Sequence, residues 1–157
     1  MSEIKKEALS LAALYPTMQK VLNAGGEFLF YPNGSSMLPT IRPGRDGVLL
    51  SRADTIKRGD LLLYVRRDGS FVLHRLVKIK KDGSLVMRGD AQYIDEGGIL
   101  PKAVVGRVCA IVRGKKEIRT SSLSFQAKGR ARRASYPLRR FFHRAKGKLK
   151  RMLKGKK

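Results

Sequence analysis

The chain has one cysteine, two histidines and no long apolar run. A single cysteine excludes a disulfide framework, and the sequence lacks the paired Cys and His spacing of a zinc site, so we expect no metal or cofactor. A membrane-spanning helix needs about 20 apolar residues in a row, which no part of the chain supplies. The N-terminal residues carry charges of both signs, unlike a secretory signal. We therefore expect a cytoplasmic protein without a membrane span.

Acidic residues are missing from the C-terminal part of the chain. The 157 residues include 35 Lys and Arg against 12 Asp and Glu, which gives a net charge of +23 at pH 7. Residues 126–157 contain 14 of the basic residues and none of the acidic ones. The length suits one domain with short appendages, and the uneven charge indicates two parts with different roles.

Hydrophobic patterning divides most of the chain into three segments. Residues 1–26 carry apolar side chains at helical spacing and close with Gly25-Gly26, which predicts an N-terminal helix. Residues 27–119 contain many short apolar strands joined by glycine-containing turns. This pattern predicts a mainly β domain, compact and strongly bent, of sandwich or barrel-like type. Residues 120–135 are rich in Ser, Arg and Gly and are predicted to be a linker.

The last segment, residues 136–157, has apolar residues at three- and four-residue steps with Arg or Lys between them. This spacing predicts a basic amphipathic helix. Such a helix suits peripheral binding to the anionic inner face of a membrane, and it also suits nucleic-acid phosphates or a partner protein. We favour the membrane over nucleic acid because the aromatic residues lie on the apolar face and are not interleaved for base stacking.

A serine behind a turn is the first candidate for chemistry. Residues 32–34 are a turn signal, Ser36 follows them, and Pro39 stiffens the chain beyond it. A serine hydroxyl is a weak nucleophile that needs an adjacent base. Of the two histidines, His143 is expected to be solvated in the basic tail. His74 lies within a predicted strand, where a backbone carbonyl would ordinarily satisfy it, but neutral imidazole also has the basicity of a catalyst near pH 7.

Four short motifs follow one another within residues 27–113. In chain order they are Ser36-Met37-x-Pro39, Arg58-Gly59-Asp60, Leu73-His74-Arg75 and Arg88-Gly89-Asp90. Together they resemble, in order, the nucleophile box, a second box, the general-base box and the Gly-Asp box of the superfamily of signal peptidase I and LexA-like serine peptidases. Bacterial signal peptidases place Lys where this chain has His, whereas the endoplasmic-reticulum and archaeal subtype places His there.

The resemblance implies a Ser–His serine peptidase. By this likeness Ser36 attacks the scissile carbonyl, and His74 takes its proton and later gives it to the leaving amine. The family's third member is an acid shortly after the Gly-Asp box. Glu96 matches it by position, Asp95 is one residue off, and Asp90 is nearby with a turn-capping role as its alternative. The sequence leaves the choice among these acids open.

Two further features modify the expected activity. The oxyanion hole should use the backbone N–H of Ser36, but the serine that many bacterial relatives place two residues earlier is Gly34 here. The family's transmembrane anchor is not expected, and Ala24-Gly25 is too close to the nucleophile for LexA-like self-cleavage. The sequence therefore predicts a serine endopeptidase that cleaves a peptide or leader. The alternatives are a non-enzymatic peptide-binding module of the same fold and a basic membrane-surface or nucleic-acid-binding protein.

Overall fold

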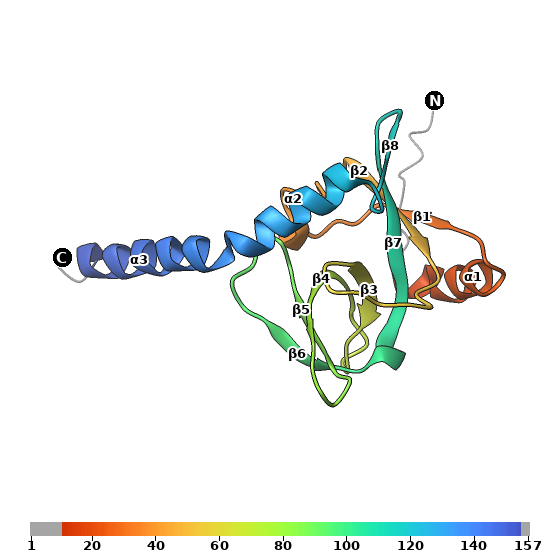
Figure 1. Cartoon of the computed structure of the whole chain (residues 1–157), viewed down its shortest axis with the longest axis horizontal. Helices are drawn as coiled ribbons and strands as arrows, with labels where there is room; N and C mark the ends of the chain where they lie inside the picture. The colour runs from red at the N-terminus through yellow and green to blue at the C-terminus, as the bar shows by residue number, and fades with distance from the viewer. Residues whose placement is uncertain (1–10, 155–157) are drawn as a thin grey trace, which may run out of the picture.

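A computed structural model describes residues 11–154, with side chains described for residues 11–146. It consists of one β-sheet, an N-terminal helix and two consecutive C-terminal helices (Figure 1), which confirms the mainly β prediction. The elements in chain order are α1 (Leu11–Asn23), β1 (Phe28–Phe30), the 3-10 helix η1 (Ser35–Met37), β2 (Asp46–Ser51), β3 (Leu61–Val65), β4 (Phe71–Ile79), β5 (Leu85–Arg88), β6 (Glu96–Ile99), the 3-10 helix η2 (Pro101–Ala103), β7 (Val104–Arg113), β8 (Lys116–Arg119), α2 (Leu123–Ala134) and α3 (Tyr136–Lys154).

The sheet is antiparallel and open. Its strand order is β1-β2-β7-β3-β4-β5-β6, and β8 pairs with β7. Irregularities in the register, between Leu49 and Leu50 of β2 and between Leu76 and Lys78 of β4, interrupt the ladders and give the strong bend that the sequence predicted. Among the described residues the end strands β1 and β6 do not pair with each other, so the bent sheet does not close into a barrel.

Strand β3 is buried on both faces because successive side chains of a strand point in opposite directions. Leu61 and Leu63 belong to the larger core cluster, which also contains Met18 of α1. Leu62 and Tyr64 belong to a smaller cluster on the other side. The strand therefore carries a tyrosine hydroxyl into the interior, where a polar group needs a hydrogen-bond partner.

The linker predicted for residues 120–135 is wrong, because most of this segment is helix α2. Ser122 is its N-cap, and the Ser122 hydroxyl accepts a hydrogen bond from the N–H of Phe125 at 3.4 Å, which stabilises the helix start. Gly129 is buried, and a Cβ there would lie 3.1 Å from Nη1 of Arg75. The Ser and Gly residues that suggested a linker thus serve a helix cap and a close contact between α2 and the sheet.

The two helices predicted at the ends of the chain are confirmed within the described residues. Helix α1 covers residues 11–23 of the predicted N-terminal segment, and residues 1–10 of that segment lie outside the described residues. Helix α3 continues from α2 and projects away from the sheet (Figure 1); residues 155–157 of the predicted tail helix also lie outside the described part. No helix within residues 11–154 combines the length and apolarity that crossing a bilayer requires.

Candidate active site

Ser36 lies in η1, a single helical turn between β1 and β2. The next side chain, Met37, is buried in the larger core cluster together with Leu73, the residue before His74. Ser36 itself is partly exposed. The first N–H groups of a helix have no acceptor within it, and among the described residues no hydrogen bond outside η1 uses the Ser36 N–H. This amide is therefore available as a hydrogen-bond donor.

His74 lies on β4 and is only 2% exposed. Its Nδ1 is 3.2 Å from the hydroxyl oxygen of Tyr64 on β3, and the same Tyr64 hydroxyl donates to Oε2 of Glu96 at 2.7 Å. The Glu96 oxygen is itself 3.9 Å from Nδ1 of His74. A tyrosine bridges the histidine and an acid, so the three side chains form a hydrogen-bonded chain.

The protonation states of Glu96, Tyr64 and His74 follow from the groups around them. Two hydrogen bonds from Arg66, at 2.7 and 2.6 Å, outweigh burial and hold the pKa of Glu96 below its usual range. Burial and the negative Glu96 raise the pKa of Tyr64 well above its usual value. The Tyr64 hydroxyl thus stays protonated and donates its hydrogen bond to Glu96. Toward His74 the Tyr64 oxygen can therefore act only as an acceptor. The arrangement therefore favours the His74 tautomer with the proton on Nδ1 and a free lone pair on Nε2.

Burial lowers the pKa of His74 to about 4, and the opposing effect of the Glu96 charge does not offset it. The imidazole is consequently neutral at pH 7. Neutral imidazole with an unprotonated Nε2 is the form that can take a proton from a serine hydroxyl.

The three acids that the sequence left open have separate partners. Glu96 joins the Tyr64–His74 chain, as its position after the Gly-Asp box suggested. Asp95 forms an ion pair with Arg88 at 3.2 Å. Asp90 is buried and receives two hydrogen bonds from Arg75, at 2.8 and 2.7 Å. Of these acids, Glu96 is the one that reaches His74 by a hydrogen-bonded path.

The serine segment rests directly on the Gly-Asp turn. The backbone oxygen of Ser36 accepts a hydrogen bond from the N–H of Ala91 at 2.8 Å, and the hydroxyl of Thr40 donates to the Asp90 carboxylate. A Cβ at Gly89 would lie 2.6 Å from the Ser36 oxygen, closer than such contacts allow. Glycine is therefore needed at position 89 for the nucleophile segment to approach the turn.

The Arg58-Gly59-Asp60 motif packs against the strand that carries the histidine. The N–H of Gly59 donates to the Leu76 oxygen, and the N–H of Leu76 donates to the Asp60 oxygen, both at 2.8 Å. Arg75, next to His74, donates Nη1 to the Gly59 oxygen at 2.9 Å. Arg75 therefore links three of the four motifs directly, and the serine motif joins them through the Gly-Asp turn.

Sequence reasoning missed two groups of site residues. Tyr64 and Arg66 lie in and just beyond β3, and the only available signal was that alternate residues of one strand share a face. Arg132 of α2 donates Nη2 to the backbone oxygens of Leu38 and Asp90, at 3.1 and 2.6 Å. It links the serine segment to the Gly-Asp turn, but no sequence pattern in the supposed linker pointed to it.

The serine and the histidine lie on neighbouring elements without a direct bond. Cα atoms of η1 and β4 approach within 8 Å of one another, yet no hydrogen bond among the described residues joins the Ser36 hydroxyl to His74. Catalytic hydrogen bonds are often long in substrate-free enzymes and tighten when the substrate is bound. Proton transfer would therefore require the serine hydroxyl to come within hydrogen-bond distance of His74.

The surroundings of Glu96 open onto a hollow of about 510 Å³ whose lining includes Arg66, Tyr93, Glu96 and His143. Ser36 and His74 do not line it. The ring of His143 stacks on that of Tyr93 with centroids 4.2 Å apart, and its side chain is exposed as the sequence suggested. Among the described residues, no group of three His, Cys, Asp or Glu side chains is arranged to hold a metal ion.

No known family model matches the chain, and no curated protein matches its sequence. The motifs and the geometry around His74 are therefore the basis for a functional assignment.

Proposed function

We propose that this protein is a serine endopeptidase with Ser36 as nucleophile and His74 as general base. One observation carries the proposal: the Glu96–Tyr64–His74 chain leaves Nε2 of a neutral imidazole as an acceptor. A histidine kept only for packing would not need its Nδ1 to be bonded to a tyrosine that is itself bonded to an ionised acid. The contact between η1 and β4 supports Ser36 as the partner of this base.

The reaction begins when the Ser36 oxygen attacks the carbonyl carbon of the scissile peptide and Nε2 of His74 takes the hydroxyl proton. The resulting oxyanion accepts a hydrogen bond from the Ser36 N–H. His74 then gives its proton to the leaving amine, which departs as the new N-terminus and leaves an acyl-serine. Water, deprotonated by Nε2 of His74, then attacks the acyl carbon; the ester C–O bond breaks, the acid product leaves, and His74 returns the proton to the Ser36 oxygen.

Glu96 and Tyr64 act on His74 as positioning residues. Each time the imidazole takes a proton, its positive charge lies 3.9 Å from the Glu96 oxygen. The negative charge of Glu96 favours this state, and the Tyr64 oxygen keeps the Nδ1–H bonded throughout. Because burial opposes the imidazolium, this support from the acid is needed for catalysis.

Labelling with a fluorophosphonate, which phosphonylates activated serines with loss of fluoride, tests the proposal. We expect the folded wild-type protein to be labelled, and Ser36→Ala and His74→Ala to lose the labelling. Ser35→Ala is the matched control, because Ser35 is an exposed serine of the same helical turn and should stay labelled. A folded wild-type protein that is not labelled, or a Ser35→Ala variant that alone loses the label, would overturn the proposal.

A peptide-binding module of the same fold is the second candidate. The observation that favours it is the missing hydrogen bond between Ser36 and His74 among the described residues. Such a module would bind peptides without labelling, and Ser36→Ala would not change its affinity. The labelling experiment therefore separates the two candidates.

We also propose that α3 lies on an anionic membrane surface. Its described part exposes Leu138, Phe141 and Phe142, at 60%, 66% and 55%, beside Arg140 and Arg144. Exposed aromatic side chains enter the interfacial region of a bilayer, and neighbouring cations bind its anionic head groups. Nucleic acid is the less favoured partner because binding through phosphates alone gives the exposed apolar side chains no role.

A further inference from the structure

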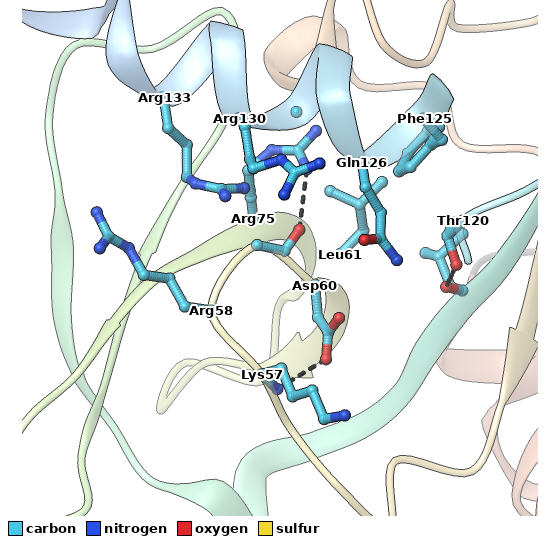
Figure 2. A pocket seen from close by; sticks show the side chains of 13 residues that line it. Lys57, Arg58, Asp60, Leu61, Arg75, Thr120, Phe125, Gln126, Arg130 and Arg133 are labelled. Carbon is cyan, nitrogen blue, oxygen red and sulfur yellow. Dashed lines mark hydrogen bonds between the residues drawn. The ribbon is translucent and has the colours of Figure 1, made fainter. Parts of the chain in front are cut away.

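A hollow of about 250 Å³ lies between α2 and the turn at residues 57–60 (Figure 2), and its lining does not include Ser36. We call it the basic hollow and define it by four cationic side chains, Lys57, Arg58, Arg130 and Arg133. Figure 2 shows the guanidinium groups of Arg130 and Arg133 on the same side of the hollow as that of Arg75. Cations from two segments far apart in the sequence therefore line one cavity.

None of these four side chains has an ion-pair partner among the described residues. Elsewhere on the protein exposed arginines do pair, as Arg52 pairs with Asp54 at 2.7 Å and Arg119 with Glu27 at 2.8 Å. The acid in the lining, Asp60, accepts a hydrogen bond from the backbone N–H of Lys57 at 2.8 Å. The cavity thus has an excess of positive charge that the described part of the chain does not neutralise.

Arg133 is held in the hollow by close contact with the backbone. Gly59 has a positive φ of 102°, and a Cβ there would lie 2.5 Å from Nη1 of Arg133. The side chain is half-buried, and burial together with the charges of Arg75, Arg58 and Arg130 lowers its pKa. A guanidinium held among other cations costs free energy unless an anion binds there. The position of Arg133 therefore favours binding of an anion, which would offset the surrounding positive charge.

We propose that the basic hollow binds a phosphate group, either free or on a lipid head group. Guanidinium groups bind phosphate oxygens through paired N–H donors, and Arg130 and Arg133 supply two of them from one helix face. The volume of about 250 Å³ admits a phosphate with part of its substituent. This inference does not depend on peptidase activity, because the site shares neither Ser36 nor His74.

Calorimetric titration of the full chain with inorganic phosphate, at ionic strength fixed by NaCl, tests the site. We expect saturable binding of one phosphate and at least tenfold weaker binding in Arg130→Gln/Arg133→Gln. Arg130→Gln alone, which changes an exposed side chain, should weaken binding without affecting folding. The matched control is Lys81→Gln/Lys115→Gln, which removes the same charge from two exposed turns and should bind phosphate like wild type.

A parallel titration with dioctanoyl phosphatidic acid below its micelle concentration identifies the source of the phosphate. Tighter binding than inorganic phosphate, lost in the same variants, assigns the site to lipid head groups, whereas equal affinity assigns it to free phosphate. Two results overturn the proposal. One is no saturable binding of either compound, and the other is an equal loss in the Lys81→Gln/Lys115→Gln control, which would indicate general charge attraction.

Discussion

Arg75 binds both carboxylate oxygens of Asp90, and the two side chains are only 4% and 5% exposed. Burial raises the pKa of Asp90, but the hydrogen bonds and charge of Arg75 outweigh it, so the pKa is lowered and the acid is ionised at neutral pH. The pair joins the histidine motif to the Gly-Asp motif. The ion pair therefore stabilises the arrangement of the candidate site, whereas the proposed proton transfer takes place at His74.

Asp90→Asn should lower the free energy of unfolding by about 3 kcal/mol, because it leaves the Arg75 charge buried without its partner. Urea unfolding measures the loss. The double variant Arg75→Met/Asp90→Leu removes both charges together. Its loss of unfolding free energy should be clearly smaller than the summed losses of Arg75→Met and Asp90→Leu. Additive losses would mean that the pair is not coupled.

Gly89→Ala should disturb the nucleophile segment. Its added methyl group meets the Ser36 oxygen at 2.6 Å, so the segment or the turn must shift, at a cost of about 1–3 kcal/mol. The rate of fluorophosphonate labelling should fall as well. Gly34→Ala is the matched control two residues before the serine, where an added Cβ meets nothing within 4 Å. Similar losses of stability and labelling rate in both variants would contradict the role given to the contact between Gly89 and the Ser36 oxygen.

Tyr64→Phe should slow labelling at least about tenfold, a part of the ~10²–10⁴-fold effect of a general base. Without the hydroxyl, Nδ1 of His74 loses the acceptor that fixes the tautomer. Tyr31→Phe, which removes the hydroxyl of a tyrosine that is 56% exposed, should label at the wild-type rate. Urea unfolding of both variants shows whether a slower rate reflects lost folding. Wild-type labelling by Tyr64→Phe would show that the tyrosine does not position the base.

The sequence predicts those parts of the fold that depend on residues close together in the chain. The Asp68-Gly69 turn lies between paired β3 and β4, and Gly69 has the positive φ that such a turn needs. Helix α2 was missed because its Ser122 cap, Gly129 and arginines also suit a linker, and its stability comes from contacts with distant residues. Local pattern cannot show such contacts.

The candidate site was only partly readable for the same reason. Motif spacing singled out Ser36 and His74 and ranked Glu96 as the acid that matches by position, and the Glu96–Tyr64–His74 chain agrees with that ranking. The bridging Tyr64 depends on the pairing register of two strands, which sets Leu62 opposite His74 and brings Tyr64 diagonally beside it. Residues of β3 are apolar on both faces, so their pattern alone does not show which of them faces His74.

His74 should make stability depend on pH between 7 and 5. Its pKa is about 4 in the folded protein against 6.5 for an unperturbed histidine, so the unfolded chain binds the proton first. Stability is therefore complete above pH 6.5 and is lost as the pH falls, by about 2 kcal/mol between pH 7 and 5. Carboxylates with lowered pKa, such as Asp90, lose their contribution at lower pH.

The measurement is urea unfolding at several pH values in wild type and in His74→Gln. The glutamine variant cannot bind the proton, so its stability should change by about 2 kcal/mol less over this range. Parallel pH dependences in the two proteins would mean that His74 is not neutral and buried as described.

Phe141→Ser/Phe142→Ser should weaken binding to vesicles that contain anionic lipid. The two rings are largely exposed on α3, and their removal takes away the apolar part of the attachment while the basic charges remain. Co-sedimentation with vesicles of phosphatidylcholine and phosphatidylserine measures the effect. We expect at least tenfold weaker binding in the double variant, and weaker binding of wild type as salt rises.

Leu123→Ser is the matched control, because Leu123 is 80% exposed but lies at the start of α2. It should bind vesicles like wild type. If the phenylalanine variant binds vesicles normally but duplex DNA binds wild type more tightly than vesicles do, the basic helix serves nucleic acid instead. The two partners are separable in this way because lipid binding needs both the rings and the charges, whereas binding to phosphates needs the charges alone.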